Sequence, residues 1–257
     1  MINFRDGLFR IWYWYVSTVD KNAEILFMNY GYSGADEKID LDPKDEINRY
    51  SIQLYHLLAN AVPLQNKDLV EIGCGRGGGL AYITKRFSPT SAVGVDLNQR
   101  AVDFSNKHYR IPNLSFKQGD AQQLPLKNSS CDAVINVESS HRYPDMDLFL
   151  SEVVRILRPG GNFLFTDFRY NHEMPSLQNS LKNSGLEIVK EEDITSNVVN
   201  SLKMDDSRRR NLVERLVPSF LKKIALNFAG AIGTETYNQF ENRDYIYMNY
   251  ILRKTGN

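Results

Sequence analysis

A glycine-rich turn carries the strongest chemical signal in the chain. Gly73, Gly75 and Gly78 satisfy the G-x-G-x-x-G pattern directly after a short apolar run, where glycines let the backbone approach a bound dinucleotide closely. Glu71 lies two positions before Gly73 and adds a carboxylate that can accept a hydrogen bond from an ammonium group, which NAD lacks. The turn therefore favours a nucleotide cofactor with an amino-acid group. An NAD site, or a tight turn with a solvated glutamate, stays open from this segment alone.

Two more carboxylates follow later apolar runs. Asp96, followed by Leu97, lies about twenty residues beyond the glycines, where an acid can accept hydrogen bonds from ribose hydroxyls. Asp120, followed by Ala121, could accept from an adenine amino group, although an aspartate here is also typical of an ordinary turn. Together with the glycine-rich turn, these residues predict a site for an adenosine-containing cofactor.

His141 is the candidate catalytic residue. It comes a few residues after the apolar run 133–137, and ligands of open α/β sheets bind at the carboxyl ends of the strands. Histidine is the side chain best matched to taking a proton near neutral pH, so we predict that His141 is a general base and that Asp145 orients it. The alternative is a surface or packing role. The other three histidines have no comparable placement.

The segments between these residues alternate between strand and helix signals. Apolar runs predict buried parallel strands at 69–72, 92–95, 114–116, 133–137 and 162–166. Stretches with helical spacing separate them at 79–87, 100–109 and 147–157, and Pro159-Gly160-Gly161 is expected to end the last helix. This alternation predicts a doubly wound α/β sheet.

The flanks break the alternation. Residues 1–60 are predicted to be mainly helical, with Asp42-Pro43 marking the start of a helix that runs to about Leu58. Residues 195–230 have helical spacing between a strand near 186–189 and a final strand at 245–252. We interpret this insertion as a lid, although a helix that completes the core fits the spacing equally well. We expect one domain, composed of an N-terminal helical cap (1–60), a cofactor-binding core (61–194), a helical lid (195–232) and a C-terminal strand region (233–257).

Composition and charge narrow the class of partner. The 31 Lys and Arg residues balance the 31 Asp and Glu residues, so no overall positive field attracts nucleic acid or an anionic membrane. The only cysteines, Cys74 and Cys131, fall in predicted loop or core segments, which argues against disulfides and favours the cytoplasm. The beginning of the chain lacks the pattern of a signal peptide or a transmembrane segment.

Three other features concern the acceptor pocket, the surface and metal binding. Aromatic residues between Phe9 and Tyr15 could line an apolar acceptor pocket, pack as a helix face or touch a membrane surface. The charge runs Arg208-Arg209-Arg210 and Lys222-Lys223 are predicted to be solvated helix faces. No group of His, Cys and carboxylate residues has the spacing of metal ligands, so no metal is predicted.

The motifs in this order resemble the class I S-adenosylmethionine-dependent methyltransferases, and residues 151–161 match the segment before their fifth strand. The resemblance covers about residues 66–170. It implies a seven-stranded sheet of order 3-2-1-4-5-7-6 with the last strand antiparallel, S-adenosylmethionine as cofactor and S-adenosylhomocysteine as product. The cofactor-binding residues implied in this way are Tyr32, Glu71, Gly73, Cys74, Gly75, Asp96, Leu97, Asp120, Ala121 and Asn136.

A closer resemblance rests on Asn29-Tyr30-Gly31-Tyr32 and on the sequence from Asn136 to Pro144. These segments look like the phthiotriol/phenolphthiotriol dimycocerosates methyltransferases, which methylate a hydroxyl of a polyketide-derived lipid, and like O-methyltransferases that tailor polyketides. The resemblance implies O-methylation of a small, apolar, hydroxylated acceptor, with Tyr30 and Tyr32 closing over the cofactor. An amine or carbon acceptor, or a protein that binds the cofactor without catalysis, stays open, and the sequence does not predict the oligomeric state.

Overall fold

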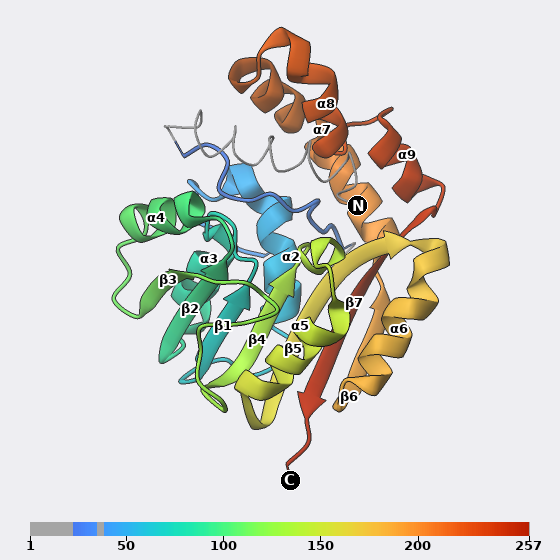
Figure 1. The fold of residues 1–257 in the computed structure, drawn as a ribbon. Coiled ribbons are helices and arrows are strands. Elements are labelled where there is room, and N and C mark those ends of the chain that lie inside the picture. The colour runs from blue at the N-terminus through green and yellow to red at the C-terminus, as the bar shows by residue number, and fades with distance from the viewer. Residues whose placement is uncertain (1–22, 35–38, 257) are drawn as a thin grey trace.

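The computed structural model describes residues 23–34 and 39–256 of the chain. Its centre is a seven-stranded sheet in the order β3-β2-β1-β4-β5-β7-β6 (Figure 1). The strands are β1 (Asp68–Ile72), β2 (Ser91–Asp96), β3 (Leu114–Gln118), β4 (Cys131–Val137), β5 (Leu157–Tyr170), β6 (Leu186–Asp193) and β7 (Tyr245–Lys254). Strands β1 to β5 pair in parallel, whereas β7 is antiparallel to its neighbours β5 and β6. The predicted doubly wound sheet and its strand order are therefore confirmed.

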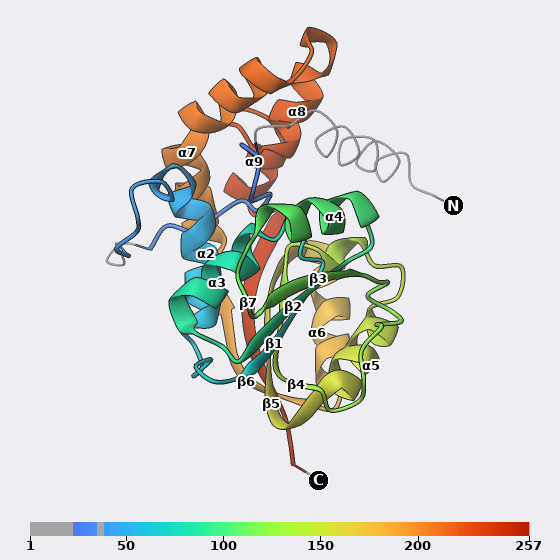
Figure 2. The ribbon, with the colours of Figure 1, turned by 90° about the vertical axis from the view of Figure 1, so that its left-hand side faces the viewer.

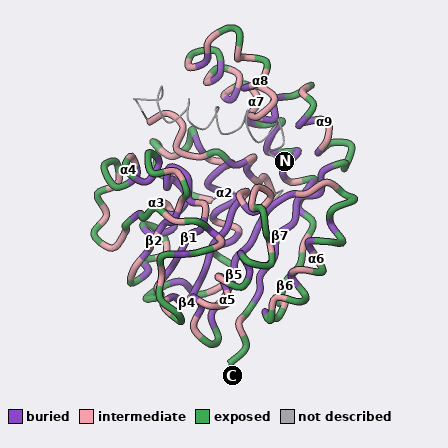
Figure 3. The backbone as a smooth tube through the Cα atoms, in the orientation of Figure 1, coloured by how far each residue is buried: buried purple, intermediate pink, exposed green. Residues whose placement is uncertain are grey.

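Helices cover both faces of this sheet (Figure 2). One face packs against α2 (Arg49–Ala59), α3 (Gly78–Phe87) and α4 (Gln99–His108), and the other against α5 (Met146–Ile156) and α6 (Met174–Asn183). The described residues also contain the short 3-10 helices η1 (Glu46–Asn48), η2 (Ser140–Arg142), η3 (Asn171–Glu173) and η4 (Ser219–Leu221). Buried residues concentrate along the strands (Figure 3), so the core is the pair of layers between sheet and helices.

All the predicted strands and helices of the core are present, with boundaries that differ by a few residues, but the expected helix stop at Pro159-Gly160-Gly161 was wrong. The last predicted helix was expected to include Leu157, whereas α5 ends at Ile156 and β5 begins immediately after it. Pro159-Gly160-Gly161 therefore lies inside a strand instead of behind a helix. The register between β4 and β5 shifts there, and Gly160 adopts a φ of +78°, because the strand must accommodate extra residues before regular pairing resumes.

Residues 1–60 were expected to be mainly helical. This expectation is wrong for residues 23–34 and 39–45, the described residues that precede η1. Residues 23–34 are irregular, and the helix expected to begin at Asp42-Pro43 begins only with η1 and α2. The backbone of 23–34 is bonded to distant elements instead of to itself: the amide of Tyr32 donates to the carbonyl of Tyr50, and that of Ser33 to the carbonyl of Asn197. The aromatic residues between Phe9 and Tyr15 lie outside the described residues.

The predicted helices of 195–230 are present as α7 (Thr195–Leu216), η4 and α8 (Lys222–Phe228). They separate at Pro218, which lacks the amide hydrogen that a continuous helix requires. In α7, Val198 and Leu202 belong to the main core, whereas Val213 packs in a separate cluster with α8. The first half of α7 therefore completes the core, and its second half projects with α8 beyond the carboxyl ends of the parallel strands (Figure 1).

A further helix, α9 (Glu235–Glu241), lies in the region where only a strand was expected. Thr234 caps it by accepting a hydrogen bond from the amide of Tyr237, which is a common way to begin a helix. Among the described residues, no helix combines the length and apolar character that crossing a membrane requires.

Candidate active site

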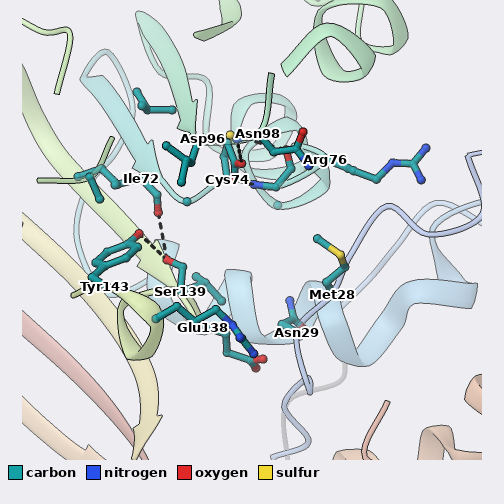
Figure 4. A pocket seen from close by; sticks show the side chains of 18 of the residues that line it. Met28, Asn29, Ile72, Cys74, Arg76, Asp96, Asn98, Glu138, Ser139 and Tyr143 are labelled. Carbon is teal, nitrogen blue, oxygen red and sulfur yellow. Dashed lines mark hydrogen bonds between the residues drawn. The ribbon is translucent and has the colours of Figure 1, made fainter. Parts of the chain in front are cut away.

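A cavity of about 550 Å³ opens at the carboxyl ends of β1, β2 and β4 (Figure 4). Ligands of doubly wound sheets bind at this edge, where the strand order reverses between β1 and β4. The wall consists of residues 26–29, 55, 72–76, 78–79, 95–98, 119–122, 137–139 and 142–144. The fold therefore brings the loops after four strands together with one N-terminal segment.

Seven of the predicted cofactor residues line this cavity: Gly73, Cys74, Gly75, Asp96, Leu97, Asp120 and Ala121. The Asp96 carboxylate accepts hydrogen bonds from the amides of Gly75 and Asn98, both at 2.8 Å. Burial raises the pKa of Asp96, although these two donors oppose the shift. The carboxylate thus fixes the glycine-rich turn and still faces the cavity.

The backbone of the glycine-rich turn passes close to the loop after β4. Gly73 adopts a φ of +72°, and a Cβ atom there would lie 2.4 Å from the Ser139 Oγ. A larger residue would be strained in its backbone and would collide with the opposite wall. The glycine is required at this position by the shape of the cavity itself.

Asp120 combines the two roles that the sequence left open. Its side chain accepts a hydrogen bond from the amide of Gln122 at 2.9 Å, as an aspartate in a turn commonly does. It also lines the cavity, next to Ala121 and Gly119. The turn therefore presents a carboxylate to the site.

Glu71 does not line the cavity. It is buried behind the wall, where its Oε1 accepts a hydrogen bond at 2.8 Å from the hydroxyl of Tyr55, a wall residue. Burial raises the pKa of Glu71 to about 8. In place of the predicted direct contact with a cofactor ammonium group, Glu71 is linked to the cavity through the hydroxyl of Tyr55.

This buried carboxyl predicts a pH-dependent stability. Because the pKa of Glu71 is raised from 4.5 to about 8, its contribution is greatest at low pH and is lost as the pH rises toward 8. The Glu71→Gln variant should therefore gain stability relative to wild type from pH 5 to pH 8, by up to about 1.4 kcal/mol per pH unit. Urea denaturation at pH 5 and pH 8 measures the difference in unfolding free energy between the variant and wild type. Glu187→Gln, at an exposed position, is the control. A difference that does not change with pH would contradict the assignment.

Tyr32 and Asn136 also lie outside the wall. Tyr32 packs against the core, and the chain reaches the cavity earlier, through residues 26–29. The side-chain amide of Asn136 donates to the carbonyl of Ile72 at 2.9 Å and to Ser139 Oγ at 2.7 Å. Asn136 therefore ties β1 to the loop after β4 and supports the wall from behind.

Glu138 is a cavity residue that the sequence reasoning missed. It follows β4 with a φ of +46°, which is uncommon for a residue with a side chain. Its Oε1 accepts hydrogen bonds from the amide of Tyr30 and the hydroxyl of Tyr247, both at 2.7 Å. Burial raises its pKa to about 8. In Figure 4 it lies beside Asn29, at the end of the cavity away from Asp96.

His141 lies on η2 beside the cavity and is not part of its wall. Its Nδ1 lies 2.7 Å from Oδ1 of Asp167, a fully buried residue of β5. The same carboxylate accepts hydrogen bonds from the Ser140 hydroxyl and the His141 amide, and it pairs with Arg169. A carboxylate at Nδ1 holds the proton on that nitrogen and leaves Nε2 as a proton acceptor.

The charges of this pair follow from its surroundings. Burial would raise the pKa of Asp167, but the neighbouring His141 and Arg169 hold it well below its usual range. Burial lowers the pKa of His141 below 6.5, although Asp167 opposes this shift. The pair is therefore a neutral imidazole beside an ionised carboxylate at neutral pH, which is the state a general base requires.

The predicted partner of His141 was wrong. Asp145 caps α5 by accepting hydrogen bonds from the amides of Asp147 and Leu148, both at 3.0 Å. The carboxylate at His141 is Asp167, and a sequence signal for it existed, because Asp167 directly follows the predicted strand 162–166 just as Asp96 follows another. Among the described residues, no group of three or more His, Cys, Asp or Glu side chains is arranged to hold a metal ion.

The strand order, with a cavity at the switch point, is the arrangement expected of the class I S-adenosylmethionine-dependent methyltransferases. Residues 70–165 match a protein family described as a methyltransferase domain. The chain is 40% identical over 211 residues to a fatty-acid O-methyltransferase of Mycolicibacterium smegmatis, covering 82% of this chain and 77% of that protein. It is 38% identical over 250 residues to a phthiotriol/phenolphthiotriol dimycocerosates methyltransferase of Mycobacterium tuberculosis, covering 95% and 92%. The chain belongs to the family of these methyltransferases, and its cofactor is S-adenosylmethionine.

The fold is also similar to the crystal structure of the cyclase SpnF. The TM-score is 0.72 with 19% identity, and the match covers 96% of each chain. At this identity the similarity concerns the fold alone. The reaction has to be argued from the residues of the site.

Proposed function

We propose that the protein is an O-methyltransferase that acts on a hydroxyl of a small apolar acceptor, polyketide-like or lipid in nature. The observation that carries this proposal is the His141–Asp167 pair beside the cofactor cavity, with Nδ1 and Oδ1 2.7 Å apart. The two relatives, named for a fatty acid and for a phthiotriol lipid, support an apolar acceptor. Two buried free cysteines support a cytoplasmic location.

In this proposal the wall residues hold the cofactor and His141 handles the proton. Asp96 would accept hydrogen bonds from the ribose hydroxyls and Asp120 from the adenine amino group, and the backbone of the glycine-rich turn would face the amino-acid portion. Glu71 and Tyr32 stay predictions as cofactor residues, Glu71 acting through Tyr55. Bound S-adenosylmethionine supplies an activated methyl group, and its sulfur keeps the electron pair of the broken carbon–sulfur bond.

The proton of the acceptor moves to this chain. His141 Nε2 takes it from the acceptor hydroxyl while the oxygen forms its bond to the methyl carbon. Asp167 keeps the ring oriented and stabilises the imidazolium that forms. His141 then releases the proton to water. Because the methyl transfer is an in-line displacement, the walls must also hold the acceptor oxygen opposite the departing sulfur.

A second candidate is methylation of a carboxylate, as in fatty-acid ester formation. The relative named fatty-acid O-methyltransferase and the presence of Arg142 in the cavity wall favour it, because guanidinium groups bind carboxylates. A carboxylate is already ionised at neutral pH and needs no base. The two candidates therefore differ in their dependence on His141.

The test is methyl transfer from labelled S-adenosylmethionine to a matched pair of acceptors, a long-chain secondary alcohol and the fatty acid of equal length. Mass spectrometry and NMR of the product identify the methylated atom. An ether product supports the leading proposal, and an ester product supports the second candidate. A methyl group on carbon or nitrogen, found in a wider acceptor panel, would overturn both.

A further inference from the structure

One arginine of the predicted solvated run 208–210 is buried. Arg209 on α7 is 7% exposed, and its Nε donates to Asp205 Oδ2 at 2.9 Å. Burying a guanidinium costs free energy unless its donors are satisfied. Its remaining donors point to backbone carbonyls of other elements, so the arginine joins segments that are distant in sequence.

The first group of contacts is with the N-terminal part of the cavity wall. Arg209 Nη2 donates to the carbonyl of Asn29 at 3.3 Å and to that of Tyr30 at 3.0 Å. Nη1 donates to the carbonyl of Ala229, directly after α8, at 3.0 Å. One side chain therefore connects α7, the end of α8 and the segment 26–30, of which residues 26–29 line the cofactor cavity.

Both backbone polar groups of Tyr30 are hydrogen-bonded to other elements. Its carbonyl accepts from Arg209 and, at 2.6 Å, from the Ser201 hydroxyl of α7. Its amide donates to Glu138, the residue at the far end of the cavity. The peptide group between Asn29 and Tyr30 thus accepts from Arg209 through its carbonyl and donates to Glu138 through its amide, which forms a continuous path from α7 to the carboxyl end of β4.

We propose that Arg209 is a positioning residue that holds segment 26–30 in the cofactor cavity and thereby makes cofactor affinity depend on α7. The segment has no regular secondary structure of its own, so its position depends on bonds to other elements. Next to it, Gly31 has a φ of +81°, and a Cβ atom there would lie 2.5 Å from Ser201 Oγ. The absence of a side chain at Gly31 therefore allows the backbone of this segment to pack directly against α7. The inference rests on the cofactor cavity and does not depend on the acceptor.

The experiment compares Arg209→Gln with Arg208→Gln in calorimetric titrations with S-adenosylhomocysteine. Arg208 is the matched control because it pairs with the same Asp205 but is more exposed. The exposed fraction of the side chain is 24% for Arg208 and 8% for Arg209. We expect Kd to rise by about tenfold or more in Arg209→Gln, the order expected when hydrogen bonds from a charged group are lost. Arg208→Gln should stay within about twofold of wild type, a change of about 0.4 kcal/mol.

Hydrogen exchange of the ligand-free variants separates positioning from general destabilisation. Amides of residues 26–33 should exchange faster in Arg209→Gln, while those of β1 and β4 keep wild-type rates. A variant with a lower Tm, unchanged Kd and uniformly faster exchange would overturn the proposal. If Arg209→Gln does not fold, Ser201→Ala removes one bond to the same carbonyl and must show a smaller change in the same direction. Binding of S-adenosylhomocysteine by the wild-type protein in the same titration tests the cofactor site separately from the role of Arg209.

Discussion

Replacing Asp96 with alanine is expected to weaken the binding of both S-adenosylmethionine and S-adenosylhomocysteine by about 100-fold or more. Hydrogen bonds to a charged group contribute about 1.5–3 kcal/mol each, and two to a ribose would account for this loss. Asp96 also accepts from the amide of Gly75 at 2.8 Å, so its removal releases the turn that lies along the cofactor. Isothermal titration calorimetry with both ligands measures the effect.

Two further variants make this result specific. Asp96→Asn keeps one carbonyl oxygen and should lose less affinity than the alanine variant. Asp103→Ala removes an exposed carboxylate on α4 that accepts a hydrogen bond from Gln99. This variant should bind both ligands with wild-type affinity. If Asp96→Ala stayed folded by circular dichroism and bound both ligands with wild-type affinity, the cofactor would not occupy the cavity as proposed.

The core of the fold was predictable because its signals are local. Each parallel strand is a short apolar run, and each following helix has apolar residues at helical spacing. The glycine-rich turn at residues 73–78 and the acid that ends β2 add a motif whose geometry is shared by many nucleotide-binding sheets. The seven predicted residues that line the cavity come from the carboxyl ends of β1, β2 and β3 and the loops that follow them.

The N-terminal part of the site was not predictable from local pattern. Residues 23–34 contain apolar and aromatic side chains that fit a helix, yet their backbone groups bond to residues 50, 138 and 197 and to α7. Except for the bond to Tyr50, these bonds link positions more than a hundred residues apart, and none of them leaves a periodic signal. The family resemblance implied Tyr32 as a cofactor-binding residue, whereas the N-terminal segment lines the cavity with residues 26–29.

Charged residues were misassigned when sequence spacing was taken as proximity. Asp145 is near His141 in the chain but caps a helix, whereas Asp167 reaches the imidazole from the neighbouring strand. The run at 208–210 gives no indication that its central residue faces inward. Burial of Arg209 depends on α7 packing over the segment 26–30, which only the tertiary structure specifies.

Replacing His141 with alanine is expected to lower kcat on a hydroxyl acceptor by about 10²- to 10⁴-fold, the usual contribution of a general base. The affinity for S-adenosylhomocysteine should stay unchanged, because His141 is not part of the cavity wall. Asp167→Asn should give a smaller loss, since it keeps an oxygen near Nδ1 but removes the charge that stabilises the imidazolium. Steady-state assays and calorimetry on the same preparations separate the two effects.

The pH profile distinguishes this chemical role from a packing role. Because burial lowers the pKa of His141 below 6.5, the neutral imidazole dominates at neutral pH, and wild-type kcat should fall only as the pH drops through that lowered value. The acidic limb should disappear in His141→Ala and persist in His172→Ala, a matched change of an exposed histidine. On a carboxylate acceptor, which needs no base, both variants should retain wild-type kcat. A loss of equal size on alcohol and acid acceptors would show that His141 supports the shape of the acceptor site and takes no proton.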